Sequence, residues 1–332
     1  MASHAKYKVT AIGNAIVDVL APVNDDFLLA HNVEKGGMHL IDEKRGETLL
    51  SSMNEPVVMS GGSAGNTIAG LAQLGASSAY IGKVREDRLG KRFRDDMQEL
   101  GVNFDTPAAK EGASTARCFV FVTPDGERTM NTYLGACTTL DSNDVDEAII
   151  ADSEVTYLEG YLFDPPEAKK AFYTAAKAAH ASGRKVALSL SDSFCVGRHK
   201  DDFLKFTKEG VDILFANEDE IKQLLDVTDF DAALAEVRKL NVIACLTRGG
   251  NGSVVVEPDG SVHNVDAVKV DLVDTTGAGD LYAAGFLHGY TSGASLKDAG
   301  RMGALVAGEI VSHFGARSEK PLKDLLKDAG LA

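Results

Sequence analysis

The sequence has few of the residues that mark secreted, membrane-bound or metal-binding proteins. Its four cysteines, at positions 118, 137, 195 and 245, form no CxxC pair and no zinc-ligand spacing. No apolar run approaches the roughly 18 residues that span a bilayer, and the start MASHAKYK lacks the apolar core of a secretory signal. These absences predict a cytoplasmic protein with core thiols and no membrane partner.

Basic residues are also scarce. Lys and Arg number 34 against 49 Asp and Glu, a formal net charge of −15, and no Lys- or Arg-rich run occurs. Because proteins bind phosphate backbones through clustered basic side chains, no nucleic-acid partner is expected. Hydrophobic residues at 44% and charged residues at 25% are typical of a folded globular protein.

Short apolar runs alternate with helical patterns along much of the 332-residue chain. Strands are predicted at 9–12, 78–81, 186–190, 212–216 and 242–247, and helices at 66–74, 87–100, 218–225, 230–240, 279–290, 296–313 and 322–328. This alternation is typical of an α/β fold with a mostly parallel central sheet flanked by helices. No linker or repeat interrupts it, so a single domain over residues 1–332 is predicted.

One region departs from this alternation. Residues 116–123 and 128–133 flank the turn Pro124-Asp125-Gly126, a pattern that predicts a β-hairpin. Its long strands favour a small antiparallel β lid that covers a site, drawn from about residues 18–45 and 112–136. The polar segment 24–41 is expected to supply further strands to this lid.

Glycine is the residue in excess, at 33 of 332. The segment 274–280 (DTTGAGD) follows a strand-like run at 270–273 and opens a predicted helix. Glycines at a helix start leave free N–H groups at the positive end of the helix dipole, which suits a phosphate. Asp280 in the first turn should stay ionised at neutral pH and can accept a hydroxyl proton. The plainer alternative is a tight turn with a first-turn carboxylate.

Two other phosphate-binding motifs are absent. Tyr282 stands where the dinucleotide fingerprint GxGxxG needs a small residue, which argues against a dehydrogenase. The P-loop pattern GxxxxGK[ST] occurs nowhere in the chain.

Polar residues near the N-terminus form two further candidate groups. The segment 61–66 (GGSAGN) lets the backbone approach a ligand, and its Ser63 and Asn66 can bond hydroxyl groups. Asn14 and Asp18 follow the first predicted strand, and an amide with a carboxylate is typical of a grip on sugar hydroxyls. Alternatively, the first group is a helix N-cap and the second a pair of loop caps.

With these motifs the chain resembles, over nearly its full length, the ribokinase-like (PfkB) family of ATP-dependent sugar and nucleoside kinases, and within it the adenosine kinases. Residues 274–280 resemble the family's C-terminal signature, 61–66 its N-terminal signature, and 217–220 (NEDE) its NxxE motif. The resemblance implies transfer of the γ-phosphate of ATP to a hydroxymethyl group. Asp280 would be the base, and the amides of Gly277, Ala278 and Gly279 the anion hole.

The resemblance also implies cofactor contacts. Asn217 and Glu220 would organise Mg²⁺ through water, and the residues that would contact ATP are Thr247, Gly249 and Thr276, with Arg248 between the first two. The segment 315–318 (GARS) resembles a loop that closes over a monovalent cation, so Gly315 and Ser318 are candidate K⁺ contacts. Its simpler interpretation is a helix stop with glycine.

Within the family, several residues resemble those of the adenosine kinases. Asp18 would hold two ribose hydroxyls with help from Asn14, and the residues expected to bind the rest of the acceptor are Gly61, Gly62, Ser63, Asn66, Leu134, Tyr161, Leu162 and Phe194. The last four would form an apolar slot for a nucleobase. However, Leu162 stands where an aromatic residue is commoner, and Met38 where a polar contact to the base is expected.

The alternative is therefore a sugar kinase of the ribokinase or fructokinase type, with a simple sugar as acceptor. A non-catalytic sugar-binding protein is less well supported, since such a protein is expected to lose Asp280 or its glycines, and all are present. The small-molecule partners are thus ATP and a nucleoside or sugar, for a monomer or homodimer.

Overall fold

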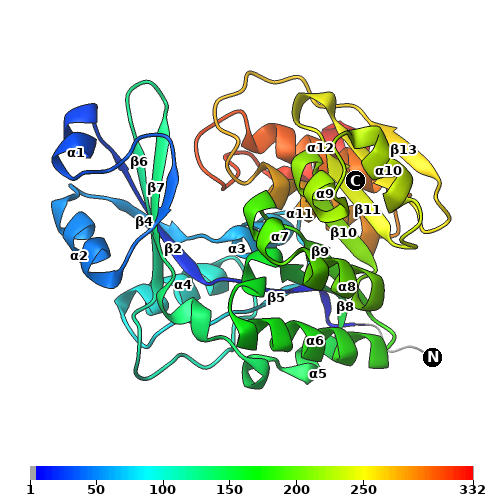
Figure 1. Cartoon of the computed structure of the whole chain (residues 1–332), viewed down its shortest axis with the longest axis horizontal. Coiled ribbons are helices and arrows are strands. Elements are labelled where there is room, and N and C mark those ends of the chain that lie inside the picture. Colours follow the sequence, from blue (N-terminus) through cyan, green and yellow to red (C-terminus); the bar gives the residue numbers. More distant parts are fainter. Residues whose placement is uncertain (1–4, 332) are drawn as a thin grey trace.

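The larger of two β-sheets lies at the centre of the protein. The computed structural model describes residues 5–331. The strands of this sheet are β1 (Tyr7–Ile12), β5 (Ser78–Ile81), β8 (Ser153–Glu159), β9 (Lys185–Ser189), β10 (Ile213–Asn217), β11 (Ile243–Thr247), β12 (Ser253–Val256) and β13 (Val262–Val265). They follow the order β13-β12-β11-β10-β9-β8-β1-β5 (Figure 1). From β5 to β11 all neighbours are parallel, and β12 and β13 are antiparallel additions at one edge.

Helices cover both faces of this sheet. The α-helices are α1 (Asp25–Ala30), α2 (Glu43–Ser52), α3 (Ser63–Gln73), α4 (Arg88–Glu99), α5 (Glu147–Ala151), α6 (Pro166–Ala181), α7 (Ser193–Arg198), α8 (Lys200–Gly210), α9 (Glu218–Leu225), α10 (Phe230–Val237), α11 (Ala278–Thr291), α12 (Leu296–Ile310) and α13 (Leu322–Asp328). Short 3₁₀ turns are η1 (Gly135–Thr139), η2 (Ser142–Asp144), η3 (Gly160–Phe163) and η4 (Gly249–Asn251).

Each buried strand supplies side chains to two hydrophobic cores. In β10, Ile213 and Phe215 join a core with α3, α11 and α12, whereas Leu214 and Ala216 join a second core with α6, α8, α9 and α10. Parallel sheets buried on both faces have such continuous apolar strands. The carboxyl ends of β9, β10 and β11 are therefore held in place by hydrophobic packing on both faces of the sheet.

A second, smaller sheet projects from the side of the molecule at which β5 lies (Figure 1). Its strands are β2 (Ile16–Pro22), β3 (Met38–Leu40), β4 (Val57–Ser60), β6 (Ala116–Val122) and β7 (Arg128–Tyr133), in the order β3-β7-β6-β2-β4. On one face, Val17, Val19 and Phe119 are buried in the same core as Leu28 of α1 and Leu49 of α2. This packing leaves the opposite face without covering helices.

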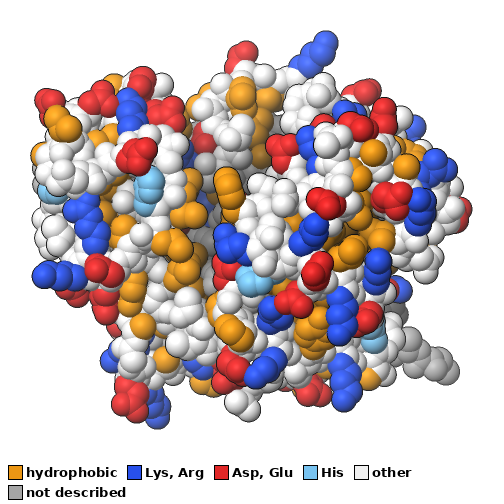
Figure 2. Space-filling model, viewed as in Figure 1, with side chains coloured by type: hydrophobic (Ala, Val, Ile, Leu, Met, Phe, Trp, Pro, Cys, Tyr) orange, Lys and Arg blue, Asp and Glu red, His pale blue; other side chains and the backbone are white. Residues whose placement is uncertain are grey.

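We call that opposite face the open face. Residues paired directly across strands point to the same side of a sheet. One row of the open face consists of Met59, Asp18, Cys118, Thr132 and Leu40, and the next of Val57, Leu20, Val120, Met130 and Met38. Asp18 is the one charged residue in these two rows. Hydrophobic side chains also gather along the hollow between the smaller sheet and the body of the protein (Figure 2).

The structure confirms the predicted α/β fold with its mostly parallel sheet. The predicted segments 78–81, 218–225 and 322–328 coincide with β5, α9 and α13, and the other predicted elements overlap observed ones with shifted ends. The hairpin is present as β6 and β7. Residues 24–41 contain one short strand, β3, but also helix α1, and β4 lies outside both stretches expected to form the lid.

The strand predicted at 270–273 is wrong. These residues have no regular secondary structure, and Val270, Leu272 and Val273 are exposed. The physical reason is a competing partner, because the N–H groups of Val273 and Asp274 donate to the carbonyl of Val311 just after α12 (2.8 and 3.3 Å). No helix among residues 5–331 is both long enough and apolar enough to cross a membrane.

Candidate active site

The start of helix α11 presents unpaired backbone amides. Gly277 precedes the helix with φ 76°, a left-handed conformation that favours glycine. Among residues 5–331, the N–H groups of Gly277 and Gly279 meet no acceptor, whereas that of Ala278 donates to Thr275 O at 3.2 Å. A side chain built at Gly279 would meet no atom within 4 Å. Two of the three amides predicted for an anion hole are thus available to a ligand, with open space beside them.

Asp280 lies in the first turn of α11, and each of its carboxylate oxygens accepts one hydrogen bond. Oδ1 accepts from Ser63 Oγ at 2.6 Å and Oδ2 from Asn66 Nδ2 at 2.9 Å. Burial raises the pKa of Asp280 to about 6, although both bonds and the charge of Arg317 oppose the rise. The sequence argument from the helix dipole overlooked this burial. A carboxylate with this pKa is still mostly ionised at neutral pH and suits a general base.

The glycines at the start of helix α3 are crowded. A Cβ at Gly61 would lie 2.3 Å from the carboxylate of Asp18, and one at Gly62, where φ is 81°, would lie 2.4 Å from Asn14 O. A side chain at Gly62 would collide with backbone, and one at Gly61 would displace the Asp18 carboxylate. The absence of side chains lets α3 begin against the β1–β2 segment and brings Ser63 to Asp280.

A buried carboxylate fixes this arrangement. Glu159, at the end of β8 and 1% exposed, accepts from Asn14 Nδ2 at 2.7 Å and from Ala64 N at 2.8 Å. Burial raises its pKa to about 7, against the effect of these bonds. Asn14 is therefore engaged by the protein and positions the loop that leads to Asp18. Sequence reasoning missed Glu159, whose one signal was a charged residue that ends an apolar strand.

Asp18 extends from β2 on the open face. Among residues 5–331 no donor forms a hydrogen bond with its carboxylate. Burial raises its pKa to about 6, the charges of Arg317 and Arg128 lower it, and Asp280 raises it. Asp18 and Asp280 are thus close enough for their charges to interact, and Asp18 has oxygens available for a ligand.

Asn217 and Glu220 satisfy each other at the start of α9. The side chain of Asn217 accepts from the N–H groups of Asp219 and Glu220, and Glu220 accepts from Asn217 Nδ2 at 2.7 Å and Asn217 N at 2.9 Å. Burial raises the pKa of Glu220 to about 7. The pair is a capping box, and it also borders the cavity described next.

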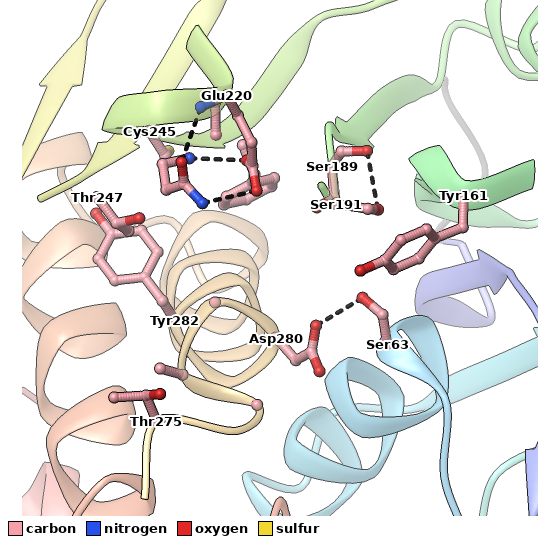
Figure 3. A pocket seen from close by; sticks show the side chains of 16 residues that line it. Ser63, Tyr161, Ser189, Ser191, Glu220, Cys245, Thr247, Thr275, Asp280 and Tyr282 are labelled. Atoms are coloured by element: carbon pink, nitrogen blue, oxygen red, sulfur yellow. Dashed lines mark hydrogen bonds between the residues drawn. The ribbon is translucent and has the colours of Figure 1, made fainter. Parts of the chain in front are cut away.

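A cavity of about 260 Å³ lies between the start of α11, Ser63 and the Asn217–Glu220 pair (Figure 3). Asp18, Asn14 and Glu159 are not among its lining residues. Its lining residues are Ser63, Tyr161, Ser189, Ser191, Phe215, Ala216, Asn217, Glu220, Cys245, Thr247, Thr275, Gly277, Ala278, Gly279, Asp280 and Tyr282. It lies at the carboxyl ends of β9, β10 and β11, where α/β sheets bind ligands. In Figure 3, Tyr161 points toward Ser63 and Asp280, with Glu220 across the cavity.

The other residues predicted to contact ATP lie at or near this cavity. Thr247 lines it, but Gly249 and Thr276 do not. A Cβ at Gly249 would meet open space, and Thr276 N donates to Asp274 Oδ1 at 3.0 Å. Arg248 is engaged elsewhere, since it lies over the ring of Phe230 at 3.9 Å and pairs with Glu218.

Of the four residues predicted to form a nucleobase slot, Tyr161 alone lines the cavity. Leu134 precedes η1 at the end of β7. Leu162 is fully buried in the second hydrophobic core, because η3 turns its side chain inward, and Phe194 is 77% exposed on α7. Met38 is 52% exposed on the open face. Leu162 therefore cannot contact a ligand in this conformation, and Phe194 borders no part of the cavity.

The loop after α12 packs against the start of α11. Gly315 N donates to Asp274 Oδ2 at 3.0 Å, whereas Ser318 Oγ donates to Lys320 O at 2.7 Å. Among residues 5–331, no group of three or more His, Cys, Asp or Glu side chains is arranged to hold a metal ion. The K⁺ contacts at Gly315 and Ser318 stay a prediction.

Two arginines of the site were not found from the sequence. Arg128 of β7 pairs with Asp274, and both side chains are almost buried. Burial favours protonated Asp274, yet the Gly315 and Thr276 amides and Arg128 hold its pKa below the usual value. This ion pair joins the smaller sheet to the segment that leads into α11. Arg317 lies close enough to Asp18 and Asp280 for their charges to interact, and it donates to Asn66 Oδ1.

Comparison with known proteins shows the family of the chain. Residues 38–323 match the pfkB family carbohydrate kinase. The chain belongs to this family, whose members are ATP-dependent kinases that act on hydroxyl groups of sugars or nucleosides.

Relatives in the family include both nucleoside and sugar kinases. A structure of adenosine kinase from Sinorhizobium meliloti is 49% identical and superposes with a TM-score of 0.89, covering 98% of this chain and 100% of that one. A probable sugar kinase from Rhizobium etli is 45% identical with a TM-score of 0.90, covering 99% and 100%. Adenosine kinase from Saccharomyces cerevisiae is 26% identical over 332 residues, 92% of this chain and 95% of that protein.

Proposed function

We propose that this kinase transfers the γ-phosphate of ATP to the hydroxymethyl group of a nucleoside, with adenosine converted to AMP as the favoured reaction. One observation carries the proposal. Asp280, beside the free amides of α11, lies close to Asp18, whose carboxylate receives no hydrogen bond within residues 5–331. A single acceptor molecule can therefore offer ring hydroxyls to Asp18 and a reacting hydroxyl to Asp280. Both adenosine kinases among the relatives named above favour the nucleoside.

Asp280 acts as the general base. Its oxygens are oriented by Ser63 and Asn66, and each retains a lone pair for the acceptor hydroxyl. As the hydroxyl oxygen bonds to the γ-phosphorus, its proton passes to Asp280 and the bond to the β-phosphate oxygen breaks, which releases ADP. The amides of Gly277 and Gly279 donate to the phosphoryl oxygens, where charge is concentrated during transfer.

The nucleotide is expected to occupy the part of the cavity bordered by Thr247 and the pair Asn217 and Glu220. Oxygen-rich groups of this kind suit Mg²⁺, which keeps most of its water in kinase sites. Because Asn217 already occupies both oxygens of Glu220, the pair fits a contact through water better than a direct one. Bound Mg²⁺ would neutralise charge on the phosphates of ATP.

The open face supports a nucleoside acceptor. In addition to Asp18 it presents apolar side chains, and Met38 and Leu40, on β3 at the far edge of the sheet, are 52% and 64% exposed. A nucleobase next to a ribose held by Asp18 would cover such side chains from water. The smaller sheet would then act as the lid over the acceptor.

A simple sugar is the second candidate acceptor. The position of Leu162 in the core and of Phe194 in solvent favours it, since both were expected to enclose a base. The probable sugar kinase from Rhizobium etli is also nearly as similar as the Sinorhizobium enzyme.

Turnover of a substrate panel distinguishes the acceptors. Purified enzyme is incubated with ATP, MgCl₂ and adenosine, other nucleosides, ribose or fructose, and ADP release is measured with and without acceptor. Highest kcat/KM for adenosine supports the proposal. Ready use of ribose or fructose, with no nucleoside accepted, would overturn the nucleoside choice and leave the family assignment intact.

A further inference from the structure

Arg317 makes a half-buried bridge between two segments of the proposed acceptor site. It lies in the loop after α12, and its Nη2 donates to Ser60 O at 2.6 Å and to Ser60 Oγ at 3.2 Å. Its Nη1 donates to Asn66 Oδ1. Ser60 ends β4 and Asn66 belongs to α3, so one guanidinium fastens both sides of the glycine pair 61–62.

This contact fixes the orientation of the Asn66 amide. A guanidinium can only donate hydrogen bonds, so the group of Asn66 that faces Arg317 must be its oxygen. The amide nitrogen then faces Asp280, to which it donates at 2.9 Å. A reversed amide would place two oxygens against each other at Asp280 and two donors against each other at Arg317. Arg317 thus holds Asn66 in the orientation in which its amide nitrogen donates to Asp280.

Arg317 also balances charge at the site. Asp18 and Asp280 are both partly buried, and desolvating two neighbouring carboxylates favours protonation of one of them. The guanidinium charge opposes this for both. Burial lowers the pKa of Arg317, and the nearby carboxylates Asp18, Asp280 and Asp96 oppose that effect. Arginine remains ionised in such surroundings.

We propose that Arg317 is a positioning residue for phosphate transfer, which holds Asn66 so that its amide directs Asp280 toward the acceptor hydroxyl. This inference rests on the proposed role of Asp280 as base. A positional error of about 1 Å at a reacting group costs on the order of 100-fold in rate. The loss of Arg317 should therefore reduce kcat by about 10- to 100-fold.

Arg94 provides a matched structural control. Like Arg317, it uses both terminal nitrogens of its guanidinium as donors. It donates to the backbone carbonyls of Phe104 (2.5 Å) and Thr106 (2.7 Å), and it lies 4.5 Å from the ring centre of Phe104. It contacts no residue of the candidate active site. Replacing either arginine removes a comparable set of contacts, but only Arg317 adjoins Asp280.

The test compares Arg317→Met, Arg317→Lys, Arg94→Met, Asp280→Asn and the double variant Arg317→Met/Asp280→Asn. Steady-state and single-turnover kinetics are measured with ATP and adenosine, or with ribose if the panel selects a sugar, and thermal unfolding is followed in parallel. We expect Arg317→Met to lower kcat with an acceptor KM within about threefold of the parent value. Arg317→Lys keeps the positive charge but lacks the two parallel donors of the guanidinium, so its kcat should fall less than that of Arg317→Met. Arg94→Met should lower the melting temperature and leave kcat unchanged.

The double variant separates the inference from the proposed function. If Arg317 acts through Asp280, Arg317→Met should cause less than a threefold further loss in the Asp280→Asn background. An undiminished loss there, or an unchanged kcat in Arg317→Met, would overturn the inference alone. An Asp280→Asn variant that turns over within a few-fold of the parent would instead overturn the base assignment. Should Arg317→Met not fold, Arg317→Lys is combined with Asp280→Asn and judged by the same criterion.

Discussion

Two helices of this protein begin with glycines beside the same cavity, but the glycines serve different ends. At α3, side chains on Gly61 and Gly62 would collide with Asp18 and the Asn14 carbonyl within 2.4 Å. At α11, a side chain on Gly279 would meet no protein atom within 4 Å. The first pair lets the protein pack against itself, as does Gly277 against Ala316, whereas Gly279 leaves room for a ligand. Two similar glycine-rich sequences therefore lie in opposite surroundings, one crowded and one open.

Substitution of Asp280, the proposed base at the open helix start of α11, should have the largest effect on turnover. We expect Asp280→Asn to lower kcat by about 10²- to 10⁴-fold, because it removes the proton acceptor and keeps the shape of the side chain. ATP binding, measured by calorimetry, and the melting temperature should change little. Turnover close to that of the parent enzyme would show that the start of α11 is not the reaction centre.

Substitutions of the two kinds of glycine sharpen the contrast directly. Gly279→Val should fold, since the structure leaves space there, but should lower kcat by about 100-fold, as expected when donors to a transferring group are obstructed. Gly61→Ala should instead displace Asp18 and lower the melting temperature. The comparison fails if Gly279→Val is the less stable variant or if its kinetics with ATP are unchanged.

The carboxylate beside the crowded glycines should affect acceptor binding and not ATP. A charge-assisted hydrogen bond contributes about 1.5 to 3 kcal/mol, so Asp18→Ala should raise the acceptor KM about tenfold or more. The KM for ATP should remain nearly constant. If adenosine is the acceptor, 2′-deoxyadenosine should be a much poorer substrate of the parent enzyme, and Asp18→Ala should narrow that difference. An equal rise in the KM values of the acceptor and of ATP would contradict this role of Asp18.

The pH dependence of the rate should also distinguish Asp280 from Asp18. The pKa of Asp280 is raised to about 6 by burial, and its ionised form accepts the proton, so kcat should fall as the pH drops through about 6. Asp18, with its pKa raised to about 6, should add a second loss to kcat/KM over the same range. Initial rates from pH 5 to 8 at saturating and limiting acceptor provide the measurement. A kcat that is constant across this range would exclude Asp280 as the titrating base.

The smallest effect concerns the smaller sheet. We expect the turn at Asp125 and Gly126 to exchange its amide hydrogens more slowly when acceptor is bound, because phosphate transfer must exclude water. Amide exchange followed by mass spectrometry, with ATP alone as the control, would detect this. Exchange that is identical with and without acceptor would argue against a lid.

The sequence predicted those parts of the protein whose pattern is local. Alternating apolar runs identified β10, β11 and α9, and the Asp-Gly turn identified the β6–β7 hairpin. The false strand at 270–273 shows the limit, since an apolar run is a strand only where a sheet edge accepts it. Here the N–H groups of Val273 and Asp274 donate to the carbonyl of Val311 and not to a neighbouring strand.

Site residues were predictable where they form motifs, as with Asp280 and the 61–66 segment. Glu159, Arg128 and Arg317 were not, because each acts through a partner far along the chain. Arg317 lies 251 residues from Asn66, and Arg128 lies 146 residues from Asp274. A single arginine or glutamate in a sequence carries no sign of such a partner. Only the fold brings them together.

The open face of the smaller sheet also bears on how such an enzyme diversifies. Its apolar side chains come from strands that supply neither the base nor the free amides, which belong to α11. Exchanges at Leu20, Met38 or Met130 therefore alter what rests against this face without touching the groups that handle phosphate. With the proposed roles of the open face and of α11, acceptor choice and phosphate transfer depend on different segments of the chain, so acceptor choice can change by mutation while the phosphate-transfer groups stay the same.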